Sequence, residues 1–429
     1  MAKLPFYTKP FGPLQAERLL WRAGFGPRPG EAAELAKNGL QAAVQSLTRP
    51  PAEQLTGPAP TDRGAPIAPY DAFGHDHLWW LDRMVRSNRQ LVERMTLVWH
   101  DWFATSNLGV GSQKLMLNQN QTLRTGALGS FGDLLLAVTK DPAMLLWLSG
   151  VQNTVRAPNE NYGREMMELF TLGVDNGYTE SDVREQARAL TGWRGQRKDD
   201  NPADFVYVPR QHDSGTKTIF GKSGNFDWQD SCRLCLEHPN HPAYFVTKLW
   251  SYFVPTAPTR ATVSGLTALY GSGYQIRPVV EAILQHPDLY DGPRMVKPPV
   301  VYTAGLLRAL GRGVDTLLWT RLDAGAGQRL FYPPNVAGWD DTRWMDTATF
   351  RGRWFLAALA FATKTPQNGS TDPQRLVDRA QAALGGPSLT PETRAALLDF
   401  AKKNRSSGAV VLESALRQLL AVSPDLQTC

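Results

Sequence analysis

Apolar residues recur with helical spacing over most of this chain, and one short stretch interrupts the pattern. In residues 204–221, β-branched and aromatic residues instead flank Asp213-Ser214-Gly215, a combination typical of a β-hairpin turn. A chain patterned in this way cannot build a large sheet. We therefore predict a mainly α fold, a large multi-helix domain with a small β-hairpin insertion at 204–221.

The expected helices follow the same spacing and end near Gly or Pro. Two helices joined by a tight turn are expected between residues 14 and 47, and others at 78–85, 91–103, 112–124, 131–139, 142–148, 160–172, 180–190, 228–237, 241–253, 262–270, 276–285 and 297–310. Residues 50–75 form a Pro-rich loop, and C-terminal helices cover 373–421. We expect one domain over 1–429 or two closely packed helical lobes.

Composition excludes several classes of protein. Hydrophobic residues make up 42% of the 429 residues, which excludes a wholly disordered chain. No apolar run approaches the length of about 18 residues that a membrane span requires, and the first residues lack the features of an export signal. Three cysteines are too few to staple a chain of this length, so we expect a reduced, cytoplasmic location.

The charge balance gives little indication of a partner. The chain has 46 Lys and Arg against 40 Asp and Glu, a net charge of +6, without a dense basic block. Strong nucleic-acid binding is therefore not indicated, although weak binding remains an alternative. The chain also has 13 tryptophans, several of them in loops, where a tryptophan serves either as a ligand platform or as a core plug.

Several segments of the chain read as signatures of one protein family. They are Leu20-Trp-Arg-Ala-Gly-Phe-Gly-Pro-Arg-Pro29, Glu93-Arg-Met-Thr-Leu-Val-Trp-His-Asp-Trp-Phe-Ala-Thr-Ser106, Asn159-Glu-Asn-Tyr-Gly-Arg-Glu-Met-Met-Glu-Leu-Phe-Thr-Leu-Gly173, Tyr178-Thr-Glu-Ser-Asp-Val-Arg-Glu-Gln-Ala-Arg-Ala-Leu-Thr-Gly-Trp193, His212-Asp213 before Lys217, and Phe331-Tyr-Pro-Pro-Asn-Val-Ala-Gly-Trp339. They occur in order over nearly the whole chain, and they resemble the bacterial family known as domain of unknown function eighteen hundred. The resemblance implies no particular activity.

The chain departs from that family in two respects. Members often look exported, whereas this sequence shows no leader. The triplet that often reads His-Asn-His in relatives is His100-Asp101-Trp102 here. The second histidine is missing, which weakens a metal site built on that pair.

Two carboxylates on the predicted helix 160–172 are candidate catalytic residues. At about 100° per residue, Glu165 falls inside the apolar arc and Glu168 at its edge. A buried carboxylate has a raised pKa unless a cation or a metal compensates. Glu165 and Glu168 are therefore predicted to act as an acid–base pair or as metal ligands; the alternative is a salt bridge from Glu165 to Arg184 or Arg188.

Two histidines complete the predicted site. His100 shares a helix stripe with Glu93 and is a candidate base or ligand supported by that carboxylate, or else a structural histidine. His212 lies at the predicted hairpin turn, where binding groups are often displayed. Together His100, Glu165, Glu168 and His212 would suit a divalent Zn, Mn or Fe ion.

The loop 331–346 is the candidate substrate platform. Trp339, Trp344 and Asn335 offer flat rings and an amide to a sugar-like ligand, and Lys217 is a further candidate substrate-binding residue. The alternative is that the loop plugs the end of the helical domain. We expect Trp339 to be buried beside Pro333-Pro334 and Trp344 to lie nearer the surface.

These observations favour a hydrolase with a buried Glu/His site, metal-dependent or not, acting on a glycan-like or other polar substrate. A non-catalytic helical binding or scaffold protein is the alternative, followed by a weak nucleic-acid binder. Partners, reaction and oligomeric state are not indicated by the sequence.

Overall fold

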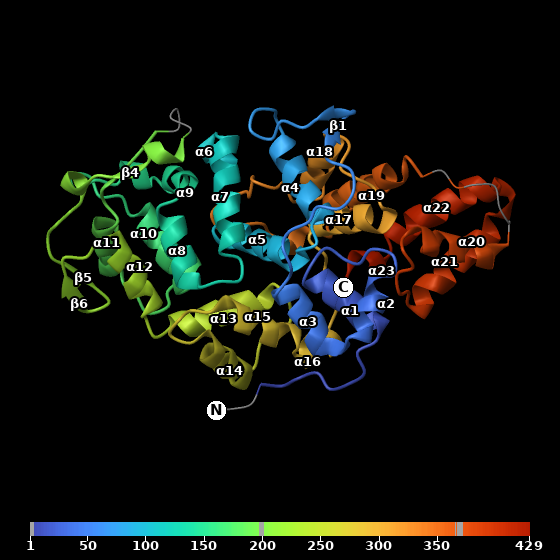
Figure 1. Ribbon diagram of the computed structural model, residues 1–429, viewed down its shortest axis with the longest axis horizontal. Coiled ribbons are helices and arrows are strands. Elements are labelled where there is room, and N and C mark those ends of the chain that lie inside the picture. Colours follow the sequence, from blue (N-terminus) through green and yellow to red (C-terminus); the bar gives the residue numbers. More distant parts are fainter. Residues whose placement is uncertain (1–3, 197–200, 365, 367–371) are drawn as a thin grey trace.

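The chain is mainly α-helical, as predicted. The computed structural model describes residues 4–196, 201–364, 366 and 372–429. In that part of the chain, helices α1 to α23 are accompanied by three two-stranded antiparallel sheets (Figure 1). Within the same residues, no helix has the length and apolar character needed to cross a membrane.

The helices and strands have the following bounds. The first half contains α1 (Pro13–Arg22), α2 (Glu31–Lys37), α3 (Gly39–Thr48), β1 (Thr61–Asp62), β2 (Ala65–Pro66), α4 (His75–Arg86), α5 (Gln90–Trp102), α6 (Asn107–Val110), α7 (Gln113–Thr125), α8 (Phe131–Thr139), α9 (Pro142–Trp147), α10 (Asn161–Glu165), a π-helix (Met166–Thr171), α11 (Glu180–Ala189), β3 (Trp193–Arg194) and β4 (Val206–Tyr207). The second half contains β5 (Lys217–Ile219), β6 (Lys222–Gly224), α12 (Trp228–Leu236), α13 (His241–Ser251), α14 (Arg260–Tyr270), α15 (Ile276–Leu284), α16 (Pro287–Asp291), α17 (Pro299–Leu310), α18 (Leu318–Gly325), α19 (Thr347–Phe361), α20 (Pro373–Ala383), α21 (Pro391–Lys403), α22 (Ala409–Ala421) and α23 (Pro424–Gln427).

Local sequence explains most helix ends. Thr179 and Asp182 form a capping box at the start of α11. Thr390 caps α21, whose first residue is Pro391. The predicted pair of helices between 14 and 47 is wrong in number, because Gly39 adopts a φ of 73° and separates α2 from α3.

A small β-hairpin is present, as predicted, but its turn is not at Asp213-Ser214-Gly215. Strand β4 pairs with β3, which precedes residue 204, and β5 pairs with β6, which follows residue 221. The turn between β5 and β6 contains Phe220 and Gly221, both with positive φ, which is the geometry that matches the twist of a tight hairpin. Asp213 does form a local turn, since its Oδ1 accepts the Gly215 N–H at 2.8 Å. The β5–β6 hairpin is therefore formed around the Phe220–Gly221 turn, and Asp213 belongs to a separate local turn.

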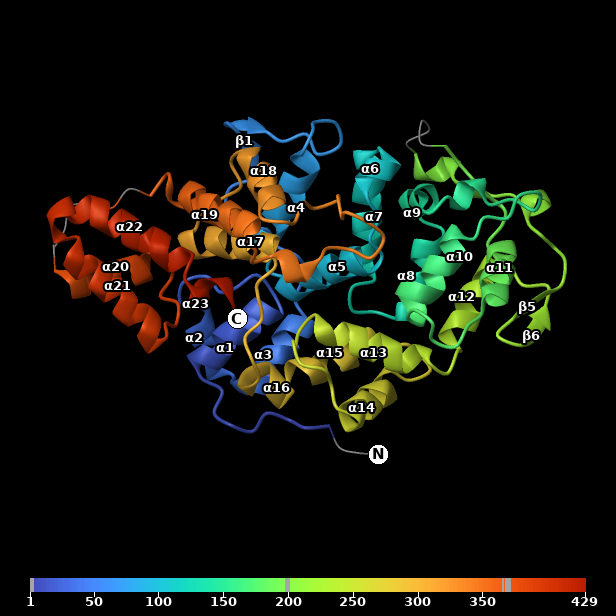
Figure 2. The same ribbon diagram turned by 180° about the vertical axis from the view of Figure 1, so that it is seen from behind.

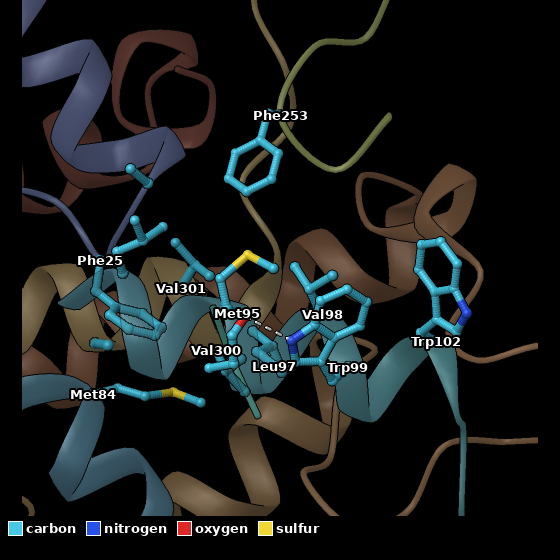
Figure 3. Packing of buried hydrophobic residues seen from close by; sticks show 14 of the residues in the cluster. Phe25, Met84, Met95, Leu97, Val98, Trp99, Trp102, Phe253, Val300 and Val301 are labelled. Atoms are coloured by element: carbon cyan, nitrogen blue, oxygen red, sulfur yellow. Dashed lines mark hydrogen bonds between the residues drawn. The ribbon is translucent and has the colours of Figure 1, made fainter. Parts of the chain in front are cut away.

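Two helices form the centre of the protein. All residues of α5 from Gln90 to His100 are buried, and α17 is buried over nearly its whole length. Met95, Val98 and Trp99 of α5 lie close to Phe25 and to Val300–Val301 of α17 (Figure 3). A helix that is buried on nearly every side requires neighbours around its whole circumference.

The remaining helices are arranged around this centre along the long axis. Helices α8 to α12 and the β5–β6 hairpin lie at one end, and α20, α21 and α22 lie at the other (Figure 1). The segment between α18 and α19 returns toward α5, as the view from behind shows (Figure 2). It contains residues 331–346, called the tryptophan loop below.

Candidate functional site

His100 is an internal hydrogen-bond acceptor. It is 2% exposed, and its Nε2 accepts the main-chain N–H of Phe331 at 3.2 Å. The lone pair of the neutral ring is thereby engaged. The rings of Trp80, Phe331 and Trp339 surround it, and burial lowers the pKa of His100 to about 3. This geometry leaves His100 without a lone pair for a metal or a substrate proton.

Glu93 does not support His100. Its carboxylate accepts two hydrogen bonds from Arg124, at 2.7 and 2.9 Å, and one from Arg83 at 3.1 Å. The indole Nε1 of Trp80 donates a further bond at 3.1 Å. Although burial would raise the pKa of Glu93, the two guanidinium groups outweigh it and hold that pKa below its usual value. Glu93 therefore belongs to a buried ion network.

Glu165 and Glu168 are half-buried rather than enclosed. The predicted burial of Glu165 is wrong because the chain changes from α to π geometry at Met166, so a constant 100° per residue does not apply beyond that point. The two carboxylates are nevertheless neighbours. Burial, and then the charge of Glu168, raises the pKa of Glu165.

The expected salt bridge to Glu165 is not formed by Arg188. Arg188 pairs with Asp213 at 2.7 Å and with Glu185. Arg164 lies 3.3 Å from Glu168. Within the described residues, Glu165 makes no hydrogen bond or ion pair, so it keeps a partly exposed carboxyl group with unused hydrogen-bonding capacity.

His212 lies in the loop before β5, and Lys217 is the first residue of that strand. The Nδ1 of His212 lies 3.1 Å from the carbonyl oxygen of Thr191. Lys217 is fully buried, and its Nζ donates to the carbonyl oxygens of Asp213 and Gly215. Lys217 thus stabilises the loop that precedes β5, and its ammonium group is not exposed to solvent.

The four predicted metal ligands are not assembled into one site. In the part of the chain that the structure describes, no group of three or more His, Cys, Asp and Glu side chains could hold a metal ion. His100 is occupied by Phe331, and Glu165 and Glu168 form only a pair. The residues present therefore do not fit the expected Zn, Mn or Fe centre.

The two tryptophans of the tryptophan loop are placed in the reverse of the expected order. Trp344 is buried, at 9% exposure, whereas Trp339 is partly exposed. Trp344 is held inside because Arg353 donates to its carbonyl oxygen at 2.9 Å. Asn335 is exposed, and its Oδ1 accepts the Ala337 N–H. The loop therefore has one plug and one partly accessible ring.

Two histidines fix the start of the tryptophan loop. His77 accepts the N–H of Leu330 and His100 that of Phe331, each at 3.2 Å. The other nitrogen of His77, Nε2, donates to Asp323 at 2.9 Å. Phe331 adopts a φ of 66°, an uncommon value for a non-glycine residue. These bonds hold a strained loop start against α4 and α5.

A second cluster of side chains lies on the other side of the same loop. Asp101 accepts the N–H of Trp339 at 2.9 Å through Oδ1 and the hydroxyl of Tyr252 at 2.7 Å through Oδ2. The Lys248 ammonium interacts electrostatically with Asp101. We call Asp101, Tyr244, Lys248, Tyr252 and Trp339 the Lys248 cluster; all five are partly exposed.

Local geometry brings these groups together. The Nζ of Lys248 and the hydroxyl of Tyr244 both donate to the Leu169 carbonyl in the π-helix, at 2.8 and 2.7 Å. The ammonium also lies 4.3 Å from the centroid of the Trp102 ring. On the loop side, Gly338 has a φ of 92°, and a Cβ there would lie 2.3 Å from the Asp101 carboxylate. Only glycine permits this approach.

Burial brings the pKa values of Asp101 and Lys248 closer together. It raises the pKa of Asp101, although hydrogen bonds from Trp339 and Tyr252 oppose the shift. It lowers the pKa of Lys248 to about 8, although Asp101 opposes that shift. Desolvation disfavours the charged form of both groups. Proton exchange at Lys248 thereby comes within reach of neutral pH.

Comparison with known proteins identifies the family but no activity. The family described as "Protein of unknown function (DUF1800)" matches residues 18–428. The chain belongs to this family. No curated protein matches the chain, and no solved structure does.

Sequence analysis of this DUF1800 chain missed the Lys248 cluster, although a signal was present. Tyr244, Lys248 and Tyr252 follow one another at intervals of four, which places a lysine between two tyrosines on one face of α13. Asp101 directly follows His100 in a family segment. It is the one residue of α5 that is not buried, and the helical spacing alone does not show this.

Proposed function

We propose that this chain is a hydrolase that acts on a polar, glycan-like substrate at the Lys248 cluster. One observation carries the proposal: a partly exposed lysine with a pKa of about 8 interacts electrostatically with a carboxylate whose pKa is raised. Displaced pKa values in a group of partly accessible side chains are typical of acid–base sites. The proposal replaces His100 by Lys248 as the base.

Lys248 would be both the base and the acid. Its neutral amine takes a proton from a water molecule, whose oxygen bonds to the electrophilic atom of the substrate. The ammonium then returns the proton to the departing oxygen, so one water molecule is added across the broken bond. Asp101 stabilises the ammonium between these steps, and Tyr252 and the Trp339 N–H hold Asp101 in place.

The tryptophan loop would provide substrate binding. Trp339 is partly exposed next to Asp101, so its ring can pack on a sugar face. Asn335 is exposed in the same loop and offers an amide to hydroxyl groups.

The test compares Lys248→Arg with the parent. Arginine keeps the positive charge and can still donate to the Leu169 carbonyl, but it does not deprotonate near neutral pH. In a screen of chromogenic glycosides and esters, we expect the parent to hydrolyse at least one substrate and Lys248→Arg to be slower by about 100-fold or more, with an unchanged melting temperature. Lys402→Arg on α21 is the control. Equal rates in the parent and Lys248→Arg would exclude Lys248 as the base.

A second measurement needs no substrate. Amine labelling followed by mass spectrometry should give a midpoint near pH 8 for Lys248. An ordinary lysine titrates near about 10.4. A midpoint for Lys248 that coincides with that ordinary value would remove the physical basis of the proposal.

Glu165 and Glu168 form a second candidate acid–base pair. The supporting observation is that Glu165 has a raised pKa and no ion-pair partner among the described residues. Glu165→Gln, tested on the same substrates, distinguishes the centres: loss of activity there but not in Lys248→Arg would favour the carboxylate pair.

A non-catalytic binding or scaffold protein is the second candidate function. The buried network of Glu93, Arg124 and Arg83 favours it, because charges in that network serve only to hold helices together. Weak nucleic-acid binding, suggested by the net charge of +6, is the third. A parent protein that hydrolyses nothing in the screen yet retains a glycan would support binding alone.

A cytoplasmic location also belongs to the proposal. Its support is that Cys232, Cys235 and Cys429 are free thiols. Cell fractionation would test it.

A further inference from the structure

A charged cavity lies where the C-terminal helices meet the centre of the protein. It measures about 430 Å³ and lies between α17, α20 and α22, with apolar walls from Ala309, Leu310, Ala382 and Ala383. Its polar lining consists of Lys364, Arg379, Glu413 and Arg417. Three cations thus face one carboxylate, which leaves an excess of two positive charges.

The carboxylate of Glu413 holds the two arginines in place. Glu413 is 1% exposed, and its two oxygens bind Arg379 at 2.8 Å and Arg417 at 2.5 Å. Arg417 also donates to the Lys364 carbonyl oxygen at 2.6 Å. A guanidinium that is already oriented loses little conformational entropy when it binds a ligand.

One of the lining residues has an unpaired donor. The Nε of Arg417 is buried and has no hydrogen-bond partner in the described part of the chain. Buried donors are normally paired, so an unpaired one requires an explanation. A clamp between α20 and α22 needs only Arg379, Glu413 and Arg417; it accounts neither for this donor nor for Lys364.

We propose that this cavity binds a small phosphate monoester or inorganic phosphate. A tetrahedral dianion matches the excess of two charges, and arginine forks suit phosphate oxygens. The volume lies in the range of small-ligand pockets and leaves room for an organic group against the alanine wall. The site lies at the α20–α22 end, away from α13 and the Lys248 cluster (Figure 1), and is independent of the proposed hydrolase.

Titration calorimetry with inorganic phosphate and phenyl phosphate tests the proposal. Lys364→Glu is the informative variant, because Lys364 is exposed and no hydrogen bond of its side chain supports the fold in the described residues. We expect the parent to bind at least one probe and Lys364→Glu to bind it about tenfold more weakly or worse. Lys402→Glu carries the same charge change on α21, outside the cavity, and should bind like the parent.

Two outcomes would overturn the proposal. The first is no binding of either probe by the parent at millimolar concentration, or equal weakening in Lys364→Glu and Lys402→Glu. The second is tight binding of a single-stranded oligonucleotide that displaces phosphate and is lost in Lys364→Glu, which would assign the surface to nucleic acid. Arg379→Gln, with a melting curve as the structural readout, should weaken phosphate binding in the same way.

Discussion

Titratable side chains contact the tryptophan loop in two regions, and these regions differ in their exposure to solvent. At the start of the loop, His77 and His100 are buried, and each accepts a main-chain N–H. On the other side, Asp101 and Lys248 are partly exposed and have donors and acceptors to spare. Both regions contact the loop, but only the second is partly exposed to solvent. Exposure to solvent and unused hydrogen-bonding capacity, rather than residue type, distinguish a candidate catalytic group from a structural titratable group.

The largest effect is expected from Glu93→Gln on the structural side. The change leaves two arginines facing an uncharged amide in the interior, and we expect the free energy of unfolding to fall by about 3 to 5 kcal/mol. Urea unfolding measures it, with the exposed Glu392→Gln as the control. Because the pKa of Glu93 is lowered on folding, its contribution should be complete above its unfolded pKa and be lost as the pH falls through the folded value. A change no larger than that of the control would show that the network is not stabilising.

The two loop tryptophans should differ in a graded way. Trp344→Ala removes a buried ring and should lower the free energy of unfolding by about 3 to 5 kcal/mol. Trp339→Ala removes a partly exposed ring and should lower it by only about 1 to 2 kcal/mol. Glycan binding should be lost in Trp339→Ala and kept in Trp344→Ala wherever the latter is folded. The opposite assignment of binding would reject the platform role of Trp339.

His100→Leu tests the hydrogen bond from the Phe331 N–H that holds the start of the tryptophan loop. The variant leaves the Phe331 N–H unpaired in the interior, and we expect a loss of about 1 to 3 kcal/mol. In the parent, the folded pKa of about 3 lies below the unfolded value of 6.5. Protonation in the unfolded state should therefore lower the stability of the parent as the pH falls from 6.5 toward 3.

The pH profile of His100→Leu should consequently be less steep than that of the parent by about one proton. Urea unfolding at several pH values measures the difference, and the partly exposed His75→Leu is the control. Identical slopes in the parent and His100→Leu would mean that His100 is not held neutral.

The smallest effect is expected from Glu165→Gln. Because Glu165 forms no ion pair or hydrogen bond among the described residues, removing its charge should change the free energy of unfolding by less than about 1 kcal/mol. Thermal melting compares it with Glu93→Gln. A loss of stability similar to that of Glu93→Gln would indicate an ion pair at Glu165 and would show that Glu165 has a structural role.

Local sequence was a good guide to the fold. The helical spacing predicted a mainly α chain, and the predicted helix 180–190 begins at the same residue as α11, which Thr179 caps. The pairing of β4 with β3 could not be predicted, because the partner strand precedes the predicted hairpin. The π-helix after Glu165 was likewise invisible to an analysis that assumed one constant helical period.

For the candidate site, sequence reasoning assigned His100 a partner that the structure does not show. It selected His100 and the tryptophan loop, which are in contact. It paired His100 with Glu93, whereas Glu93 binds Arg124 and His100 binds a backbone amide. Hydrogen-bond partners far apart in sequence, such as His100 and Phe331, are determined by the packing of whole helices.

The sequence by itself determined the family, the helical class and most helix boundaries, because these depend on residue spacing and on capping over a few neighbouring positions. Only the tertiary structure decided which titratable groups are reachable. Burial and pairing depend on what approaches from distant parts of the chain: Phe331 engages His100, Arg124 neutralises Glu93, and the π-helix carbonyl of Leu169 holds Lys248 beside Asp101. Since pKa values and access follow from those approaches, the candidate chemistry of this protein emerges only once the chain is folded.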